Sequence, residues 1–313
     1  MLTTVNQNGN GVVSTPEPPT TGEQTPGETF AAAVRSAAVR DATVRGNAAA
    51  DAAGTGDLTV PFGIHLPAAF PLFASRPRYT VRHLLKTASV PDAPAPHVYE
   101  PPRGGLITTA TSYAATPEAA FAPRLDTTAL TDLTVTVTLP DGILDHPDLL
   151  ASFVDLRVLV RLSVLENQSL LHGTPDGAIQ GLLKLPGTRG RTAENTDLAT
   201  AVTATAAEVE ETGGSCDGIV AHPAAYWELV RTGALSRLQG AGITVSRTRM
   251  MPRDTLLLGD FRAALTLLLP GRSGITLHRG AGTGGADVVE ATSRIGLAVH
   301  LPQHLLALTL GPS

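Results

Sequence analysis

Cysteine and aromatic residues are scarce in this chain of 313 residues. The single cysteine, Cys216, can form neither a disulfide within the chain nor a cysteine-rich zinc site, and a lone thiol is typical of a reducing compartment, so we expect a cytoplasmic protein. Aromatic residues make up only 4% of the sequence, which leaves few platforms for stacking nucleic-acid bases. The net charge of -5 also argues against a nucleic-acid partner, because such binding depends on neutralising phosphates with Lys and Arg.

Motifs of catalysis and ligand binding are missing as well. The sequence has no zinc-protease His-Glu-x-x-His, no phosphate-binding G-x-x-x-x-G-K-[ST] and no nucleophile elbow G-x-S-x-G. His300 and His304 are spaced as metal ligands could be, but the proline between them disfavours a helix, so we expect structural or exposed side chains. Gly280–Gly285 superficially resembles a dinucleotide loop and is expected to be a surface turn. We therefore predict no enzymatic activity, no cofactor and no metal site.

The most informative stretch of the chain runs from Ile143 to Gly173. From Asp148 on, apolar residues return at steps of three or four, and Gly173 can supply a C-terminal stop, so the pattern predicts a long helix. The helix is apolar on most sides and needs cover on more than one face. We expect no membrane partner, because charged residues interrupt the run too often for a membrane span. They are Asp155, Arg157, Arg161 and Glu166.

The N-terminal part of the chain differs in composition from the rest. Residues 1–29 are rich in Pro, Thr, Gly and Asn, and we expect them to be disordered. Residues 30–53 shift to Ala, Val and Arg, which predicts either an alanine-rich helix or an arm that orders only against a neighbour. The first residues show no secretory signal, and the folded body is expected to start near Leu58.

The segment from Tyr79 to Arg124 is dense in Pro, Ala and Thr after a short opening and cannot close a core of its own. Leu130–Leu139 alternates Val with Thr, which predicts a half-buried strand. We therefore expect a long two-stranded excursion. The remaining pattern predicts an α+β body with helices at residues 193–213 and 223–231 and strands at 218–222, 242–247, 255–259, 274–278 and 295–300.

Five short segments carry a resemblance to a known family. They are Tyr79–Leu85, Leu162–Gly173 with Ile179–Leu183, Gly218–Val230, Met251–Phe261 and Ser293–Pro302. In this order they resemble the HK97-like capsid fold shared by tailed-phage major capsid proteins and encapsulin nanocompartment shells, and the similarity runs over most of residues 79–310. The most specific piece is Glu166–Gly173, which has the E-x-x-x-L-L-x-G pattern common at the end of the family's spine helix. The resemblance implies an α+β fold with a peripheral domain, an axial domain and an extended E-loop.

The resemblance also implies domain boundaries and contact residues. The domains are a disordered region or N-terminal arm (1–55), an N-arm into the peripheral domain (56–80), the E-loop (81–128), the peripheral domain with the spine helix (129–185), the axial domain (186–270) and a return to the peripheral domain (271–313). By analogy, a five-fold pore loop contains Thr232, Gly233, Ser236, Arg237 and Gln239. E-loop contacts between subunits involve His97, Tyr99, Glu100, Phe121 and Arg124.

The family resemblance implies self-assembly, and three functions stay open. The segment before the body is short and is not the long charged helix that often precedes a phage capsid body, which favours an encapsulin. Such a protein would form an icosahedral shell of copies of itself in the cytoplasm, enclose a cargo enzyme and pass small molecules through symmetry-axis pores. The alternative is a phage or prophage major capsid protein in a virion, with nucleic acid as a partner. A further alternative is a soluble α+β enzyme or binding module.

Overall fold

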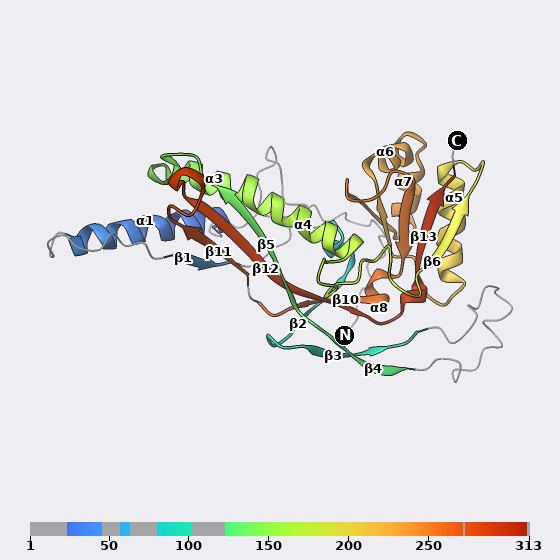
Figure 1. Cartoon of the computed structure of the whole chain (residues 1–313). Helices are drawn as coiled ribbons and strands as arrows, with labels where there is room; N and C mark the ends of the chain where they lie inside the picture. The colour runs from blue at the N-terminus through green and yellow to red at the C-terminus, as the bar shows by residue number, and fades with distance from the viewer. Residues whose placement is uncertain (1–23, 46–56, 63–79, 102–122, 272, 312–313) are drawn as a thin grey trace, which may run out of the picture.

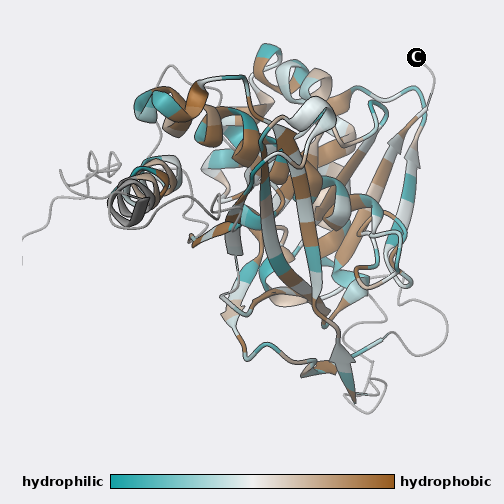
Figure 2. Cartoon of the chain, turned by 60° about the vertical axis from the view of Figure 1, so that its left-hand side comes forward, coloured by the Kyte–Doolittle hydropathy of each residue, from teal (hydrophilic) through white to brown (hydrophobic). Residues whose placement is uncertain are grey.

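The computed structural model describes residues 24–45, 57–62, 80–101, 123–271 and 273–311, with the side chains of residues 39–45 left out. These residues form two sheets, a separate two-stranded hairpin and a set of helices that pack on the sheets (Figure 1). Apolar residues concentrate on the strands and on the inner faces of the helices (Figure 2). We call the part built on the first sheet the peripheral lobe and the part built on the second sheet the axial lobe.

The first sheet is organised by its longest strand, β12 (Val288–Val299), which pairs with three neighbours. The other strands are β1 (Leu58–Pro61), β2 (Lys86–Ser89), β5 (Thr131–Thr138), β10 (Leu265–Leu269) and β11 (Ser273–His278). The Val and Thr alternation of β5 buries Leu133 and Val137 and leaves Thr134 exposed. The strand predicted at residues 130–139 is therefore confirmed.

A long helix lies across this sheet and confirms the prediction made for residues 148–173. It begins as α3 (Pro147–Phe153), passes through a π-helical turn at Val154–Val158 and continues as α4 (Leu159–His172). The helix ends at Gly173, whose φ of 89° is rarely adopted by residues that carry a side chain. We call α3, the π turn and α4 together the spine helix.

Helix α1 (Pro26–Arg45) packs against α3. Phe30, Ala31 and Val34 are buried and belong to the main core, so the apolar residues of this segment contribute to the fold of their own chain. The predicted disorder of residues 1–29 is wrong for Pro26–Thr29, which form the first turn of α1. The sequence of that turn does not indicate that α1 packs on α3, because the residue to which the turn is hydrogen-bonded lies far along the chain.

That partner is Asp155, in the π turn of the spine helix. Its two carboxylate oxygens accept hydrogen bonds from the backbone N–H of Gly27 at 2.8 Å and from Oγ1 of Thr25 at 2.6 Å. A Cβ atom on residue 27 would lie 2.2 Å from the carbonyl oxygen of Ala151, so the helices can approach this closely only with glycine there. Burial raises the pKa of the Asp155 carboxyl, although both hydrogen bonds act against that rise.

The second sheet carries the axial lobe. Its strands, in spatial order, are β6 (Arg189–Ala193), β13 (Leu305–Leu310), β9 (Thr255–Gly259), β7 (Gly218–Ala221) and β8 (Thr244–Arg247). Its helices are α5 (Leu198–Glu210), α6 (Pro223–Arg231) and α7 (Ala234–Gly240). One face of the sheet packs on these helices, and Val220 and Leu257 on the other face belong to the core of the peripheral lobe. The core of the peripheral lobe therefore reaches one face of the second sheet, and a separate apolar cluster lies between the other face and the helices.

The expected domain boundaries stay a prediction, and at three places the sheets group the strands differently. Strand β10 lies in the first sheet although residues 186–270 were assigned to the axial domain, and β13 lies in the second sheet although residues 271–313 were assigned to the peripheral domain. Strand β2, inside the expected E-loop, pairs with β10 in the first sheet. A strand pattern shows that a segment is extended and buried, but it does not specify which sheet the segment joins.

Part of the predicted two-stranded excursion is present as the hairpin of β3 (Ala95–Tyr99) and β4 (Arg124–Thr128), which pair antiparallel, whereas the strand expected at residues 130–139 belongs to the first sheet as β5. It lies beside the body, below the junction of the two lobes in the view of Figure 1. Residues 102–122, which join its strands, lie outside the described residues.

Candidate functional site

The hairpin presents two chemically different faces because side chains alternate along each strand. His97 and Tyr99 share a half-buried face. Val98 and Leu125 are directly opposite each other on the other face, where Val98 is 48% and Leu125 is 77% exposed. The hairpin therefore carries a cross-strand apolar pair with little cover from the described residues.

Strand β3 and the residues on either side of it are held on the body of their own chain. Nδ1 of His300 lies 2.8 Å from the carbonyl oxygen of Val98, and the backbone N–H of Glu100 donates to the carbonyl oxygen of His300 at 2.8 Å. Arg294 on β12 binds Asp92, which precedes β3, and Asp132 on β5, at 2.6 Å and 2.7 Å. These contacts fix the direction in which the hairpin leaves the peripheral lobe.

Four of the five E-loop residues expected at contacts between subunits lie in the described part of the chain, and all four contact residues of their own chain. His97 packs edge-on against His300 of the same chain, with ring centroids 5.4 Å apart, and burial lowers the pKa of His97, assisted by the neighbouring His300. Tyr99 and Arg124 stack on each other at 4.7 Å.

Glu100 and Phe121 complete the set. Glu100 is half-buried beside His300 through its backbone N–H, and Phe121 lies outside the described residues. The role of all five in contacts between subunits stays a prediction. The sequence analysis overlooked Val98 and Leu125, although the alternation of apolar and polar residues in His97–Tyr99 could have indicated an apolar outer face.

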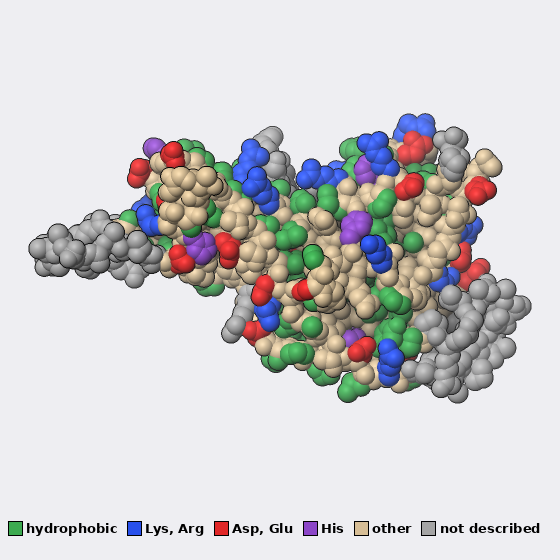
Figure 3. Space-filling view, viewed as in Figure 1, with side chains coloured by type: hydrophobic (Ala, Val, Ile, Leu, Met, Phe, Trp, Pro, Cys, Tyr) green, Lys and Arg blue, Asp and Glu red, His purple; other side chains and the backbone are tan. Residues whose placement is uncertain are grey.

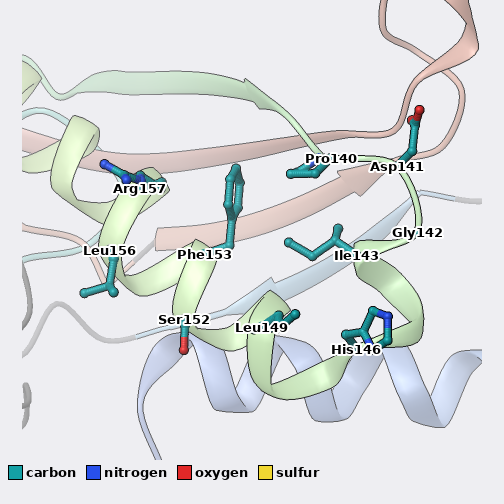
Figure 4. A pocket seen from close by; sticks show the side chains of 10 residues that line it. All are labelled: Pro140, Asp141, Gly142, Ile143, His146, Leu149, Ser152, Phe153, Leu156 and Arg157. Carbon is teal, nitrogen blue, oxygen red and sulfur yellow. The ribbon is translucent and has the colours of Figure 1, made fainter.

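A second uncovered apolar surface lies on the outer side of α3. Leu149 is 61% exposed, and Phe153 and Leu156 follow it at helical spacing. Together with the turn before α3 they form an open groove (Figure 4) lined by Pro140, Asp141, Gly142, Ile143, His146, Leu149, Ser152, Phe153, Leu156 and Arg157. The spine helix thus has one face in the core and a second face only partly covered within the chain.

The expected pore loop is mostly helical. Thr232 and Gly233 form the turn after α6, whereas Ser236, Arg237 and Gln239 lie on α7 and are exposed. The expectation of an irregular loop is wrong for residues 234–240 because Ala234, Leu235 and Leu238 bury one side of a short helix in the axial core. Gly233 has a φ of 68°, a conformation that glycine adopts readily, and this allows the tight turn between α6 and α7.

A third uncovered apolar surface lies on α6. Trp227, the only tryptophan of the sequence, is 58% exposed, and Val230 on the same side of the helix is 40% exposed. The guanidinium of Arg247 on β8 lies 4.3 Å from the ring centre of Tyr226 and 4.9 Å from that of Trp227. This cation–π stack restricts the two aromatic side chains.

The titratable groups in the interior serve the fold. Glu166 is fully buried and pairs with the buried Arg82, whose Nε donates to it at 2.8 Å, so the E-x-x-x-L-L-x-G stretch ties the spine helix to the segment before the hairpin. Burial raises the pKa of the Cys216 thiol to about 12, which is typical of a packing residue. Among the described residues, no three His, Cys, Asp or Glu side chains are placed to hold a metal ion.

None of the helices in the described ranges combines the length and the apolar content that crossing a membrane requires. No protein-family model and no curated protein sequence matches the chain.

Solved structures match the fold. A structure from Microbacterium phage Oxtober96 aligns with a TM-score of 0.56 and 14% identity over 80% of this chain and 96% of that one. A virus-like particle from Pyrococcus furiosus aligns with a TM-score of 0.53 and 11% identity over 72% and 90%. The capsid of an empty GTA particle aligns with a TM-score of 0.53 and 13% identity over 78% and 99%. The chain therefore has the α+β HK97-like capsid fold that its sequence resemblance predicted.

Proposed function

We propose that this chain is the subunit of a closed protein shell built from many copies of itself. The observation that carries the proposal is the hairpin, which is held on its own body through β3 and exposes the apolar pair Val98 and Leu125 on its outer face. A second copy that covers this face would remove the pair from water, and burying one leucine stabilises a contact by about 1.5–3 kcal/mol.

The distribution of exposed apolar side chains supports the same proposal. Within the described residues the large ones are Val98, Leu125, Leu149, Trp227 and Val230. They occupy three separate elements, namely the hairpin, α3 and α6. One binding partner at one site would not require three surfaces, whereas a subunit with neighbours on several sides would. Contacts that differ on the two partners close into rings or shells when the rotation is right, and many modest contacts together hold each subunit.

We further propose an encapsulin-type nanocompartment that encloses a cargo enzyme. The support is the family resemblance together with α1, which packs its Phe30 into the core of the subunit and is not a free scaffolding helix. In this proposal the turn and helix with Thr232, Gly233, Ser236, Arg237 and Gln239 border an opening at a symmetry axis that passes small molecules. A shell of this kind would be found in the cytoplasm.

A second candidate is the major capsid protein of a phage or of a GTA-like particle. The fold similarity to a phage structure and to the GTA capsid favours it, since these align over more of this chain than the virus-like particle does. Nucleic acid inside a virion would then take the place of the cargo enzyme. A soluble enzyme or binding module remains the alternative for a protein that does not assemble.

Purified particles test these functions. Expressed full-length protein is examined by negative-stain electron microscopy and sedimentation velocity, and the contents of any particle by absorbance ratio and mass spectrometry. Hollow shells of uniform diameter that contain a co-purified enzyme support the nanocompartment, and shells that contain nucleic acid support the capsid. A monomer or dimer that forms no particles at any salt concentration or pH overturns the shell proposal.

A further inference from the structure

The axial lobe has two opposite edges. In the order β6-β13-β9-β7-β8, strand β8 forms one edge of the sheet and β6 forms the other. Helices α6 and α7 pack over β8, and α5 packs over β13 and β9. Figure 1 shows α6 and α7 on one side of the lobe and α5 with β6 on the other. We call the surfaces on these sides the α6 edge and the α5 edge.

The α6 edge is basic. Residues 222–249, which contain α6, α7 and β8, have four arginines and one acidic residue, Glu228. Arg231 pairs with Glu228 on the same helix, and within the described residues Arg237 forms no ion pair. Figure 3 shows Lys and Arg side chains gathered over this part of the lobe. The edge therefore keeps a net positive charge.

The α5 edge is acidic. Residues 189–211, which contain β6 and α5, have five acidic residues and two arginines, Arg189 and Arg191. Glu208 is bound by Arg191 at 2.8 Å and by Arg189. Glu210 and Glu211 are exposed at the end of α5 and form no ion pair within the described part of the chain. The two edges of one lobe thus carry opposite charge.

The shapes of the two edges also differ. On α6, the exposed side contains Ala224, Trp227 and Val230, so a large aromatic ring stands out from it. On α5, the exposed residues at helical spacing are small, namely Thr200, Thr203 and Ala207, and Glu210 comes next. A protruding tryptophan against a flat surface of small side chains gives close contact, and tryptophans at the centre of a contact contribute a large share of binding energy.

We propose that the α6 edge of one subunit docks on the α5 edge of a second copy of this chain, with Trp227 at the centre of the contact and Arg231 near Glu210. The inference rests on the proposed function and names the surfaces by which copies meet. Like edges cannot pair well, since two α6 edges would bring arginines together and two α5 edges would bring carboxylates together. The pairing is therefore head to tail, which builds a ring when the rotation closes.

Charge reversal with rescue tests this pairing. Arg231→Glu and Glu210→Arg are each expected to raise the protein concentration needed for assembly at least about tenfold, and the double variant to return it toward the wild-type value. Trp227→Ala is expected to raise it at least as much, without rescue. Assembly is followed by light scattering and sedimentation, and folding of each variant by circular dichroism and thermal unfolding.

The matched control is Arg279→Glu, which makes the same change in net charge at an exposed position next to the turn between β11 and β12. Folded single variants that assemble like wild type, a double variant that assembles no better than the single ones, or an equal loss in the control all overturn the pairing. A wild-type protein that never assembles refutes the shell itself, so the two failures are distinguishable. If the charges pair, the protein concentration that wild type needs for assembly should rise at high salt. A concentration that does not change with salt contradicts the pairing.

Discussion

Replacing Leu125 with alanine is expected to weaken assembly and to leave the isolated subunit as stable as wild type. The Leu125 side chain is 77% exposed, so its truncation should change the free energy of unfolding by less than about 0.5 kcal/mol. A neighbouring copy that covers the side chain gains about 1.5–3 kcal/mol from it. Since each 1.4 kcal/mol corresponds to a factor of about ten in an equilibrium constant, the concentration at which shells form should rise roughly tenfold or more.

Leu133→Ala is the matched comparison, because Leu133 on β5 is 4% exposed and belongs to the core. This truncation should lower the free energy of unfolding by about 2–5 kcal/mol. Urea unfolding of dissociated subunits measures stability, and light scattering across a concentration series measures assembly. The reasoning is refuted if Leu125→Ala forms shells at the wild-type concentration, or if it destabilises the subunit as much as Leu133→Ala does.

Three further predictions concern the interior of the subunit. Glu166→Gln leaves the buried Arg82 without its anionic partner and should lower the free energy of unfolding by about 3–5 kcal/mol in urea titrations, and a loss below 1 kcal/mol speaks against a structural ion pair. The raised pKa of Asp155 means that its contribution to stability is present at low pH and is lost as pH rises through that pKa, so Asp155→Asn should be at least as stable as wild type at pH 7 and show a weaker pH dependence of its melting temperature. A less stable variant at pH 7 contradicts this. Cys216, with a pKa of about 12, should resist alkylation at pH 8 in the folded protein and react only in denaturant, and rapid labelling of folded protein refutes its burial.

The spine helix shows how far local pattern predicts this structure. Its existence followed from apolar periodicity, but its π turn did not, although a signal is present in the sequence. Leu150, Val154, Val158 and Leu162 are all fully buried and are spaced by four residues each. Four residues exceed one α-helical turn by about 40°, so three such steps would rotate the last side chain well away from the first. The wider π turn at Val154–Val158 absorbs that rotation and keeps all four in the core.

Elements that depend on distant partners were harder to predict. Helix α6 was predicted with its observed bounds because its signals are local, including Pro223 at the first position. Strands β10 and β13 were missed since their sequences are almost continuously apolar and show no alternation of apolar and polar residues. The docking of α1 depends on Asp155, about 130 residues away, which the N-terminal segment itself does not encode.

A hairpin was expected from the sequence, but its attachment to the body was not, and this attachment bears most on function. The sequence predicted a segment that lies on a neighbour, whereas the structure ties β3 and the residues before it to their own chain through Arg294 on β12 and His300 just after it. These contacts with its own chain do not bury the outer face of the hairpin, where Val98 and Leu125 stay exposed. They instead fix the direction of this face before any neighbour arrives. Since ordering a flexible segment costs free energy at the moment of binding, a hairpin already held on its own chain allows even a small apolar contact to favour assembly.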